Sequence, residues 1–153
     1  MLSPIFWCCY CDDMLKELRE SGVGCHLAGR WMGATMYADD LILLAPTRSA
    51  MSVMLRVCEK YALAHNISFS TDLSPALSKT KCLYMCGNMN VRNYPAPLQL
   101  NGRDLPFVTT ATHLGHELCQ DCTMNTDCKI KRASLTEAPQ SEKCLTLLSQ
   151  LRY

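Results

Sequence analysis

The sequence lacks an excess of charge of either sign. Its 153 residues include 15 basic and 14 acidic side chains, for a formal net charge of +1. Proteins that hold nucleic acid usually carry a basic face, whereas the basic residues here are scattered along the chain. Any affinity for a polyanion must therefore arise at a local site and not from the overall field of the molecule.

The sequence also lacks a long apolar run and a cleavable signal. Its longest apolar stretch falls well short of the ~20 residues that a membrane-spanning helix requires. Asp12 and Asp13 come too early for a signal peptide, and no small-residue cleavage site follows them. We therefore expect an intracellular protein of the cytoplasm or nucleus, with no membrane contact and no targeting signal.

Cysteine, by contrast, is plentiful. The chain holds 11 cysteines, which in a secreted protein would suggest a disulfide framework. Since no signal is evident, we expect free thiols in a reducing compartment, many of them acting as small core hydrophobes. Hydrophobic residues make up 48% of the chain and charged residues 19%, as is usual for a globular domain that buries a sizeable core. The oligomeric state is not indicated.

The most informative stretch is Tyr37-Ala38-Asp39-Asp40, where two adjacent carboxylates separate two apolar, strand-like runs. This pattern predicts a β-hairpin with the acidic residues at its tip. Carboxylate oxygens are suitable ligands for Mg²⁺, whose other positions are commonly taken by water and substrate phosphates. The alternative is a solvated turn without a metal, because burying an unpaired charge is costly.

Three further motifs flank the acid pair in a characteristic order. Leu2-Ser3-Pro4-Ile5-Phe6 comes before it, and Ser78-Lys79-Thr80-Lys81 and His113-Leu114-Gly115 follow it. With these motifs the chain resembles the reverse transcriptase of a non-LTR (LINE-type) retrotransposon, over residues 2–130. The resemblance implies a partial palm domain of an RNA-directed DNA polymerase. Its fold class would be α+β, an antiparallel sheet with a metal-binding hairpin, backed by helices.

The resemblance also implies roles for individual residues. Asp39 would be the principal Mg²⁺ ligand, Asp40 the secondary one, and Lys79 would protonate the leaving pyrophosphate or steady its charge. Tyr37 and His113-Leu114-Gly115 would contact the primer or nucleotide, and the substrates would be an RNA template and a DNA primer. The family's remaining metal carboxylate, its fingers and its thumb have no counterpart here. Because two-metal transfer requires a complete ligand cage, we expect no polymerisation by this chain alone.

The resemblance divides the chain into residues 1–133, a partial palm, and residues 134–153, a divergent tail that is flexible or forms a short helix. Apolar spacing predicts one helix that starts at Ser3-Pro4 and ends at Gly22 or Gly24, and another after Thr47, which can cap it. Residues 24–28 and 33–37 bracket a turn at Gly29-Arg30 and form a three-stranded meander with residues 41–45. Further strands are expected at residues 67–70, 80–85, 98–100, 105–108 and 109–115, with a hairpin turn at Asn101-Gly102 between the strands at 98–100 and 105–108.

Two rival interpretations remain. In the first, the chain is a non-catalytic protein that binds zinc, RNA or a partner. Cys119 and Cys122 have the pair spacing of a structural zinc site, and Cys128, His113 and His116 lie nearby, although an unliganded thiol cluster explains them equally. In the second, the chain is a non-functional retroelement relic. Residues 41–45 would then lack strand partners, and the exposed apolar edge would drive aggregation.

Overall fold

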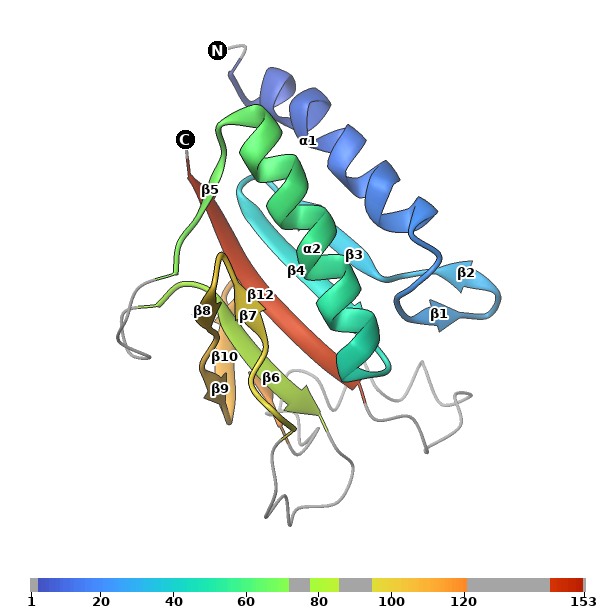
Figure 1. The fold of residues 1–153 in the computed structure, drawn as a ribbon, viewed down its shortest axis with the longest axis vertical. Coiled ribbons are helices and arrows are strands. Elements are labelled where there is room, and N and C mark those ends of the chain that lie inside the picture. The colour runs from blue at the N-terminus through green and yellow to red at the C-terminus, as the bar shows by residue number, and fades with distance from the viewer. Residues whose placement is uncertain (1–2, 72–77, 86–94, 121–143, 153) are drawn as a thin grey trace.

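The fold is built on a mixed β-sheet, and two helices cover one of its faces (Figure 1). The computed structural model describes residues 3–71, 78–85, 95–120 and 144–152. The helices are α1 (Ser3–Glu20) and α2 (Arg48–His65). The strands of this sheet, in spatial order, are β3 (Ala34–Tyr37), β4 (Asp40–Ala45), β12 (Cys144–Arg152), β6 (Lys81–Met85) and β9 (Phe107–Val108), and β5 (Ser68–Phe69) pairs with the end of β12.

Neighbouring strands of this sheet are antiparallel except β6 and β9, which are parallel. Three hairpins lie outside it. They are β1 (His26–Leu27) with β2 (Arg30–Trp31), β7 (Gln99–Leu100) with β8 (Arg103–Asp104), and β10 (Thr110–His113) with β11 (His116–Cys119).

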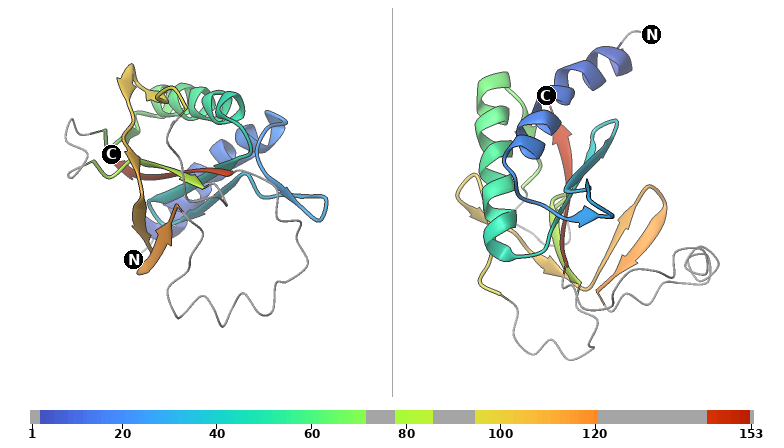
Figure 2. Two further views of the ribbon diagram at one scale, coloured as in Figure 1. Left: turned by 90° about the horizontal axis from the view of Figure 1, so that it is seen from below. Right: turned by 90° about the vertical axis from the view of Figure 1, so that its right-hand side faces the viewer.

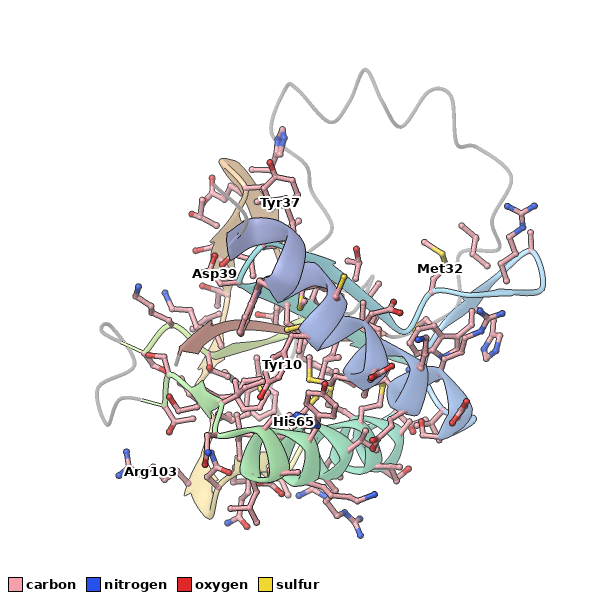
Figure 3. All side chains as sticks on the ribbon, turned by 90° about the horizontal axis from the view of Figure 1, so that it is seen from above. Tyr10, Met32, Tyr37, Asp39, His65 and Arg103 are labelled. Carbon is pink, nitrogen blue, oxygen red and sulfur yellow. The ribbon has the colours of Figure 1, made fainter. Side chains whose placement is uncertain are left out.

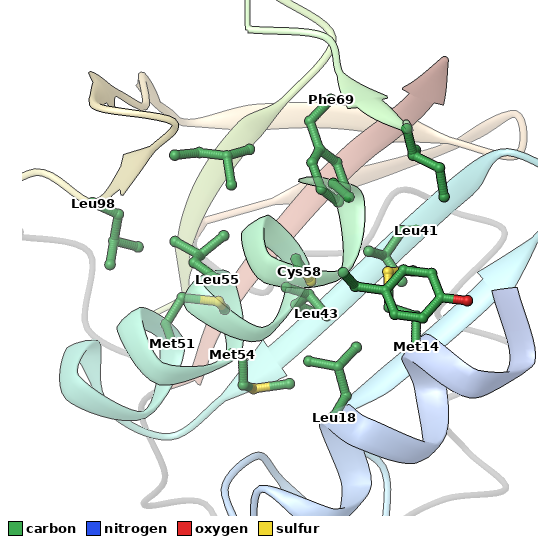
Figure 4. Packing of buried hydrophobic residues seen from close by; sticks show 14 of the residues in the cluster. Met14, Leu18, Leu41, Leu43, Met51, Met54, Leu55, Cys58, Phe69 and Leu98 are labelled. Carbon is green, nitrogen blue, oxygen red and sulfur yellow. The ribbon is translucent and has the colours of Figure 1, made fainter. Parts of the chain in front are cut away.

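The core lies between the helices and the sheet (Figure 4). Leu41, Leu43 and Ala45 alternate along β4 and are fully buried on the face that α2 covers. The helices contribute residues at helical spacing, as an amphipathic face requires. Those buried in α1 are Trp7, Cys11, Met14 and Leu18, and those in α2 are Met51, Met54, Leu55, Cys58, Tyr61 and Ala62.

The helix bounds agree well with the sequence pattern. Thr47 caps α2 as predicted, because its side chain accepts a hydrogen bond from the backbone N–H of Ala50 at 3.2 Å. Gly22 follows the end of α1 with a φ of 72°, a conformation that favours glycine. The buried faces differ in detail from the pattern. Cys9 and Tyr10 belong to the apolar pattern of α1 but are exposed, and Leu63 in the apolar pattern of α2 is 85% exposed.

The expected meander is wrong in its first half and confirmed in its second. Residues His26–Leu27 pair with Arg30–Trp31 around a two-residue turn at Ala28-Gly29, so Arg30 belongs to a strand and not to the turn. Strand β3 pairs with β4, as expected, but not with β1. Ala28 and Gly29 both have positive φ, which suits a two-residue hairpin turn and leaves Arg30 in the following strand. Trp31 then packs against Gly33, where an added Cβ would lie 2.6 Å from the indole ring. The chain therefore leaves the β1–β2 hairpin before it enters the main sheet.

The expected tail is also wrong over Cys144–Arg152, which forms β12 and not a short helix. Its residues Leu145 to Gln150 pair with the whole of β4, and Cys144 to Leu148 pair with β6. The physical reason is that the backbone groups on the inner edges of β4 and β6 need hydrogen-bond partners, which a helix does not supply. β4 therefore has a strand partner in β12, whereas the relic interpretation expected it to have none. Residues 121–143 lie outside the described part of the chain.

The Asn101-Gly102 turn is confirmed, with φ values of 52° and 71° that suit a two-residue hairpin. The strand after it is Arg103–Asp104 and not residues 105–108. Residues Phe107–Val108 leave the hairpin and pair with β6. This exit connects the small β7–β8 hairpin to the main sheet.

The cysteines whose side chains are described are free thiols, and Cys11, Cys58 and Cys82 are core residues as expected. Burial raises the pKa of Cys58 and of Cys82 to about 12, because a thiolate in an apolar core loses its hydration. These two thiols are therefore protonated and unreactive near neutral pH. Among the described helices, none is long and apolar enough to cross a membrane.

Candidate functional site

The acid pair lies at the tight turn between β3 and β4. Tyr37 pairs with Asp40, so the turn consists of Ala38 and Asp39 alone, and the predicted hairpin is confirmed. Ala38 has a φ of 52°, a left-handed conformation that costs a non-glycine residue about 1 kcal/mol. The indole N–H of Trp7 donates a hydrogen bond of 2.8 Å to the carbonyl of Ala38. This bond attaches the acidic turn to α1.

The side chains of this turn are accessible to solvent. Asp39 is exposed, Asp40 is half-buried, and Tyr37 is 67% exposed. Because side chains alternate along a strand, Asp40 and its partner Tyr37 lie on the face opposite the buried Leu41. Figure 3 shows Tyr37 and Asp39 beside the first turns of α1, at the other end of the molecule from Met32. Solvent and ligands therefore have direct access to the carboxylates.

The chain holds a second acid pair, whose charge one lysine partly offsets. The ammonium group of Lys16 contacts the carboxylates of Asp12 and Asp13 at 2.8 and 3.1 Å within α1. These two contacts raise the pKa of Lys16. In the part of the chain that the structure describes, neither Asp39 nor Asp40 forms a salt bridge. The turn thus concentrates negative charge that the described cations do not balance.

Lys79 lies at the same end of the sheet as the acidic turn. Ile42 of β4 and Lys81 of β6 both pair with Leu148 of β12, and β4 and β6 run in the same direction. Lys79 therefore enters β6 at the level at which Asp40 begins β4. One strand separates them, so their backbones are two strand spacings apart, about 10 Å. The side chain of Lys79 is exposed.

His113-Leu114-Gly115 lies at the turn of the β10–β11 hairpin. Leu114 and Gly115 have φ values of 49° and 77°, and His113 pairs with His116 across the turn. Strand β10 is confirmed, but the motif is a hairpin turn within a separate two-stranded sheet. β10 contacts β6, and the hairpin projects from the main sheet on the side opposite α2 (Figure 2). In the right-hand view of Figure 2, the β10–β11 hairpin lies below the β3–β4 turn.

Among the zinc candidates that the structure describes, Cys119 does not lie on the same face as the two histidines. His113 and His116 share one face of the β10–β11 hairpin, whereas Cys119, three residues after His116, points to the other face. Cys122 and Cys128 lie outside the described residues. Within those residues, no group of three or more His, Cys, Asp or Glu side chains is placed to hold a metal ion.

Trp7 and Ala38 are the site residues that the sequence analysis missed. Both residues position the acidic turn. Ala38 does so through its left-handed backbone conformation, and Trp7 through its hydrogen bond to the Ala38 carbonyl. No local pattern indicates this contact, because 31 positions separate the two residues.

No protein-family model matches the chain, and comparisons with curated proteins and with solved structures also found no match. The function is therefore inferred from the chain's own residues and their arrangement.

Proposed function

We propose that this chain is part of the palm of an RNA-directed DNA polymerase of the non-LTR retrotransposon type, and that alone it does not polymerise. The observation that carries the proposal is the Asp39-Asp40 pair at the β3–β4 turn, with Asp39 exposed, Asp40 half-buried and no described counter-charge. A carboxylate pair of this kind attracts a hard divalent cation, for which oxygen is the preferred ligand.

The position of Lys79 supports the same function. Lys79 lies at the end of the sheet that carries the acidic turn, so it could contact the phosphates of a nucleotide whose metal ion would be bound by Asp39 and Asp40. In phosphoryl transfer, catalysis depends mainly on such positioned charges. The RNA template and the DNA primer would be bound as substrates on this side of the molecule.

The donor set fits one Mg²⁺ ion with water in most of its positions, and it does not make a two-metal cage. Two-metal transfer needs ligands for both ions about 3.5 to 4 Å apart. The described residues offer Asp39 and Asp40 and no group of three potential ligands. Since an incomplete cage cannot hold both ions in place, we expect this chain to bind Mg²⁺ weakly and not to extend a primer.

Magnesium binding tests the acidic turn directly. We expect a titration of ¹⁵N-labelled protein with Mg²⁺ to shift the backbone amide signals of Ala38, Asp39 and Asp40 first. Asp39→Asn combined with Asp40→Asn should abolish these shifts. Asp12→Asn combined with Asp13→Asn is the matched control, because it removes an acid pair whose two carboxylates already share the ammonium group of Lys16. Shifts that begin at Asp12 and Asp13, or that survive loss of the turn carboxylates, would exclude the proposed site.

Primer extension on an RNA template with Mg²⁺ tests the second half of the proposal. We expect no extension by the purified chain or by its Asp39→Asn variant. Extension by the unchanged chain that Asp39→Asn abolishes would show that another group completes the cage. The predicted inactivity would then be wrong, while the assignment to polymerases would stand.

A further inference from the structure

Two histidines lie directly opposite each other at the tip of the β10–β11 hairpin. His113 and His116 are cross-strand partners on either side of the Leu114-Gly115 turn. The Cβ atoms of directly opposite residues are about 4.5–5.5 Å apart, and both side chains point to the same face. This separation lets two imidazole rings reach one metal ion.

The hairpin holds the two backbones in place. Leu114 and Gly115 both have positive φ, as in the turns that match the twist of two-residue hairpins. The register continues without a break from the His113–His116 pair to the Thr110–Cys119 pair. A pair of ligands that is already aligned loses less conformational entropy when it binds than a flexible pair does.

The hairpin itself carries no cationic side chain that would repel a metal ion. No lysine or arginine occurs between Thr110 and Cys119. His116 is exposed and His113 half-buried, so solvent reaches the pair. By strand alternation Glu117 and Cys119 project from the other face, which leaves the imidazoles as the metal-binding groups of this face. Neutral imidazole is a good ligand for Zn²⁺, Ni²⁺ and Cu²⁺.

We propose that His113 and His116 form a two-imidazole clamp for a first-row divalent transition-metal ion. The remaining positions of the ion would be filled by water or by donor atoms of a bound ligand. Affinity should follow the usual order for such sites, with Cu²⁺ bound more tightly than Ni²⁺. The clamp uses no cysteine, and it does not depend on the polymerase proposal.

The test is a titration of the full chain with Ni²⁺ under reducing conditions, with the ¹H–¹⁵N signals of the histidine rings as readout. These signals report binding at imidazoles even where thiols elsewhere take up metal. Paramagnetic Ni²⁺ should broaden the ring signals of His113 and His116 together. The same broadening at His26 and His65 should require much higher Ni²⁺ concentrations.

Variants separate the clamp from binding by single histidines. In His116→Gln the response of His113 should require about 100-fold more Ni²⁺, because the second imidazole no longer binds intramolecularly. His116→Gln combined with Glu117→His keeps the number of histidines but puts them on opposite faces, and it should behave like the single variant. His26→Gln, on the β1–β2 hairpin, should change nothing.

Three outcomes would overturn the clamp. The first is broadening of His113 at unchanged Ni²⁺ in His116→Gln, and the second is full affinity in the double variant. The third is a response of His113 and His116 no earlier than that of His26. The backbone amide spectrum of each variant shows whether the β10–β11 hairpin is intact, so a folding defect is recognised separately.

Discussion

At the scale of single residues, the acidic turn depends on a contact that its own sequence does not contain. Ala38 adopts a left-handed conformation that is unfavourable for alanine, and the Trp7 indole donates a hydrogen bond to its carbonyl. Trp7 is itself 7% exposed and belongs to the core. The position of Asp39 therefore depends on how α1 packs.

We predict that Trp7→Phe destabilises the protein by about 1 kcal/mol, because it removes one hydrogen-bond donor and keeps most of the ring. Urea unfolding measures this cost. Hydrogen exchange at Asp39 and Asp40 should also become faster, since the turn is no longer attached to α1. Trp31→Phe is the matched control, because it removes a similar bond from the Trp31 indole to the carbonyl of Val23 at 2.7 Å. Equal exchange at the acidic turn in both variants would contradict this role of Trp7.

At the scale of elements, the β1–β2 hairpin is positioned by the packing of one tryptophan between two glycines. A Cβ on Gly24 would lie 2.8 Å from the Trp31 indole nitrogen, and one on Gly33 would lie 2.6 Å from the ring. Backbone hydrogen bonds from Cys25 to the Leu44 carbonyl and from Leu44 to the Gly33 carbonyl connect this region to β4. The hairpin thus leaves the main sheet at a defined angle without adding a strand to it.

We predict that Gly33→Ala destabilises the protein by about 1–3 kcal/mol, because the added methyl group overlaps the Trp31 ring. Thermal unfolding of Gly33→Ala, Trp31→Ala and the double variant forms a double-mutant cycle. Since removal of the ring also removes the overlap, the double variant should be more stable than the sum of the two single changes predicts. Strict additivity would rule out this explanation of the hairpin geometry.

At the scale of the whole molecule, the last described strand completes the sheet. β12 lies between β4 and β6, and its far end pairs with β5. Strands β4 and β6 therefore both depend for hydrogen-bond partners on a strand that begins at Cys144. Without β12, two inner edges with unpaired backbone groups would face solvent, which favours pairing with other chains.

We predict that Leu147→Pro destabilises the sheet by about 1–3 kcal/mol or more, because proline removes a backbone donor from an interior strand and leaves an acceptor unsatisfied. Leu147 pairs with Leu43 on one side and with Cys82 on the other. For the Leu147→Pro variant, light scattering after size exclusion should show oligomers that become more abundant as the protein concentration rises. The control Leu147→Val keeps the backbone donor and should remain close to the unchanged protein. If both variants unfold at the same urea concentration, β12 is not an interior strand in solution.

The sequence by itself determined the local elements. Helical spacing predicted α1 and α2, Thr47 predicted the start of α2, and Asn101-Gly102 and the acid pair predicted two hairpin turns. Each of these depends on residues a few positions apart, whose backbone preferences and spacing act within one turn or one hairpin. Local pattern therefore sufficed for them.

Only the tertiary structure decided which distant segments meet. It paired β12 with β4 and β6, joined Trp7 to Ala38, and put Cys119 on the opposite hairpin face from His113. The spacing of the leucines in 144–152, considered alone, predicted at most a short helix, whereas the structure has a strand there. Sheet hydrogen bonding and burial act between residues that are close in space and far apart along the chain, so no local pattern carries that information.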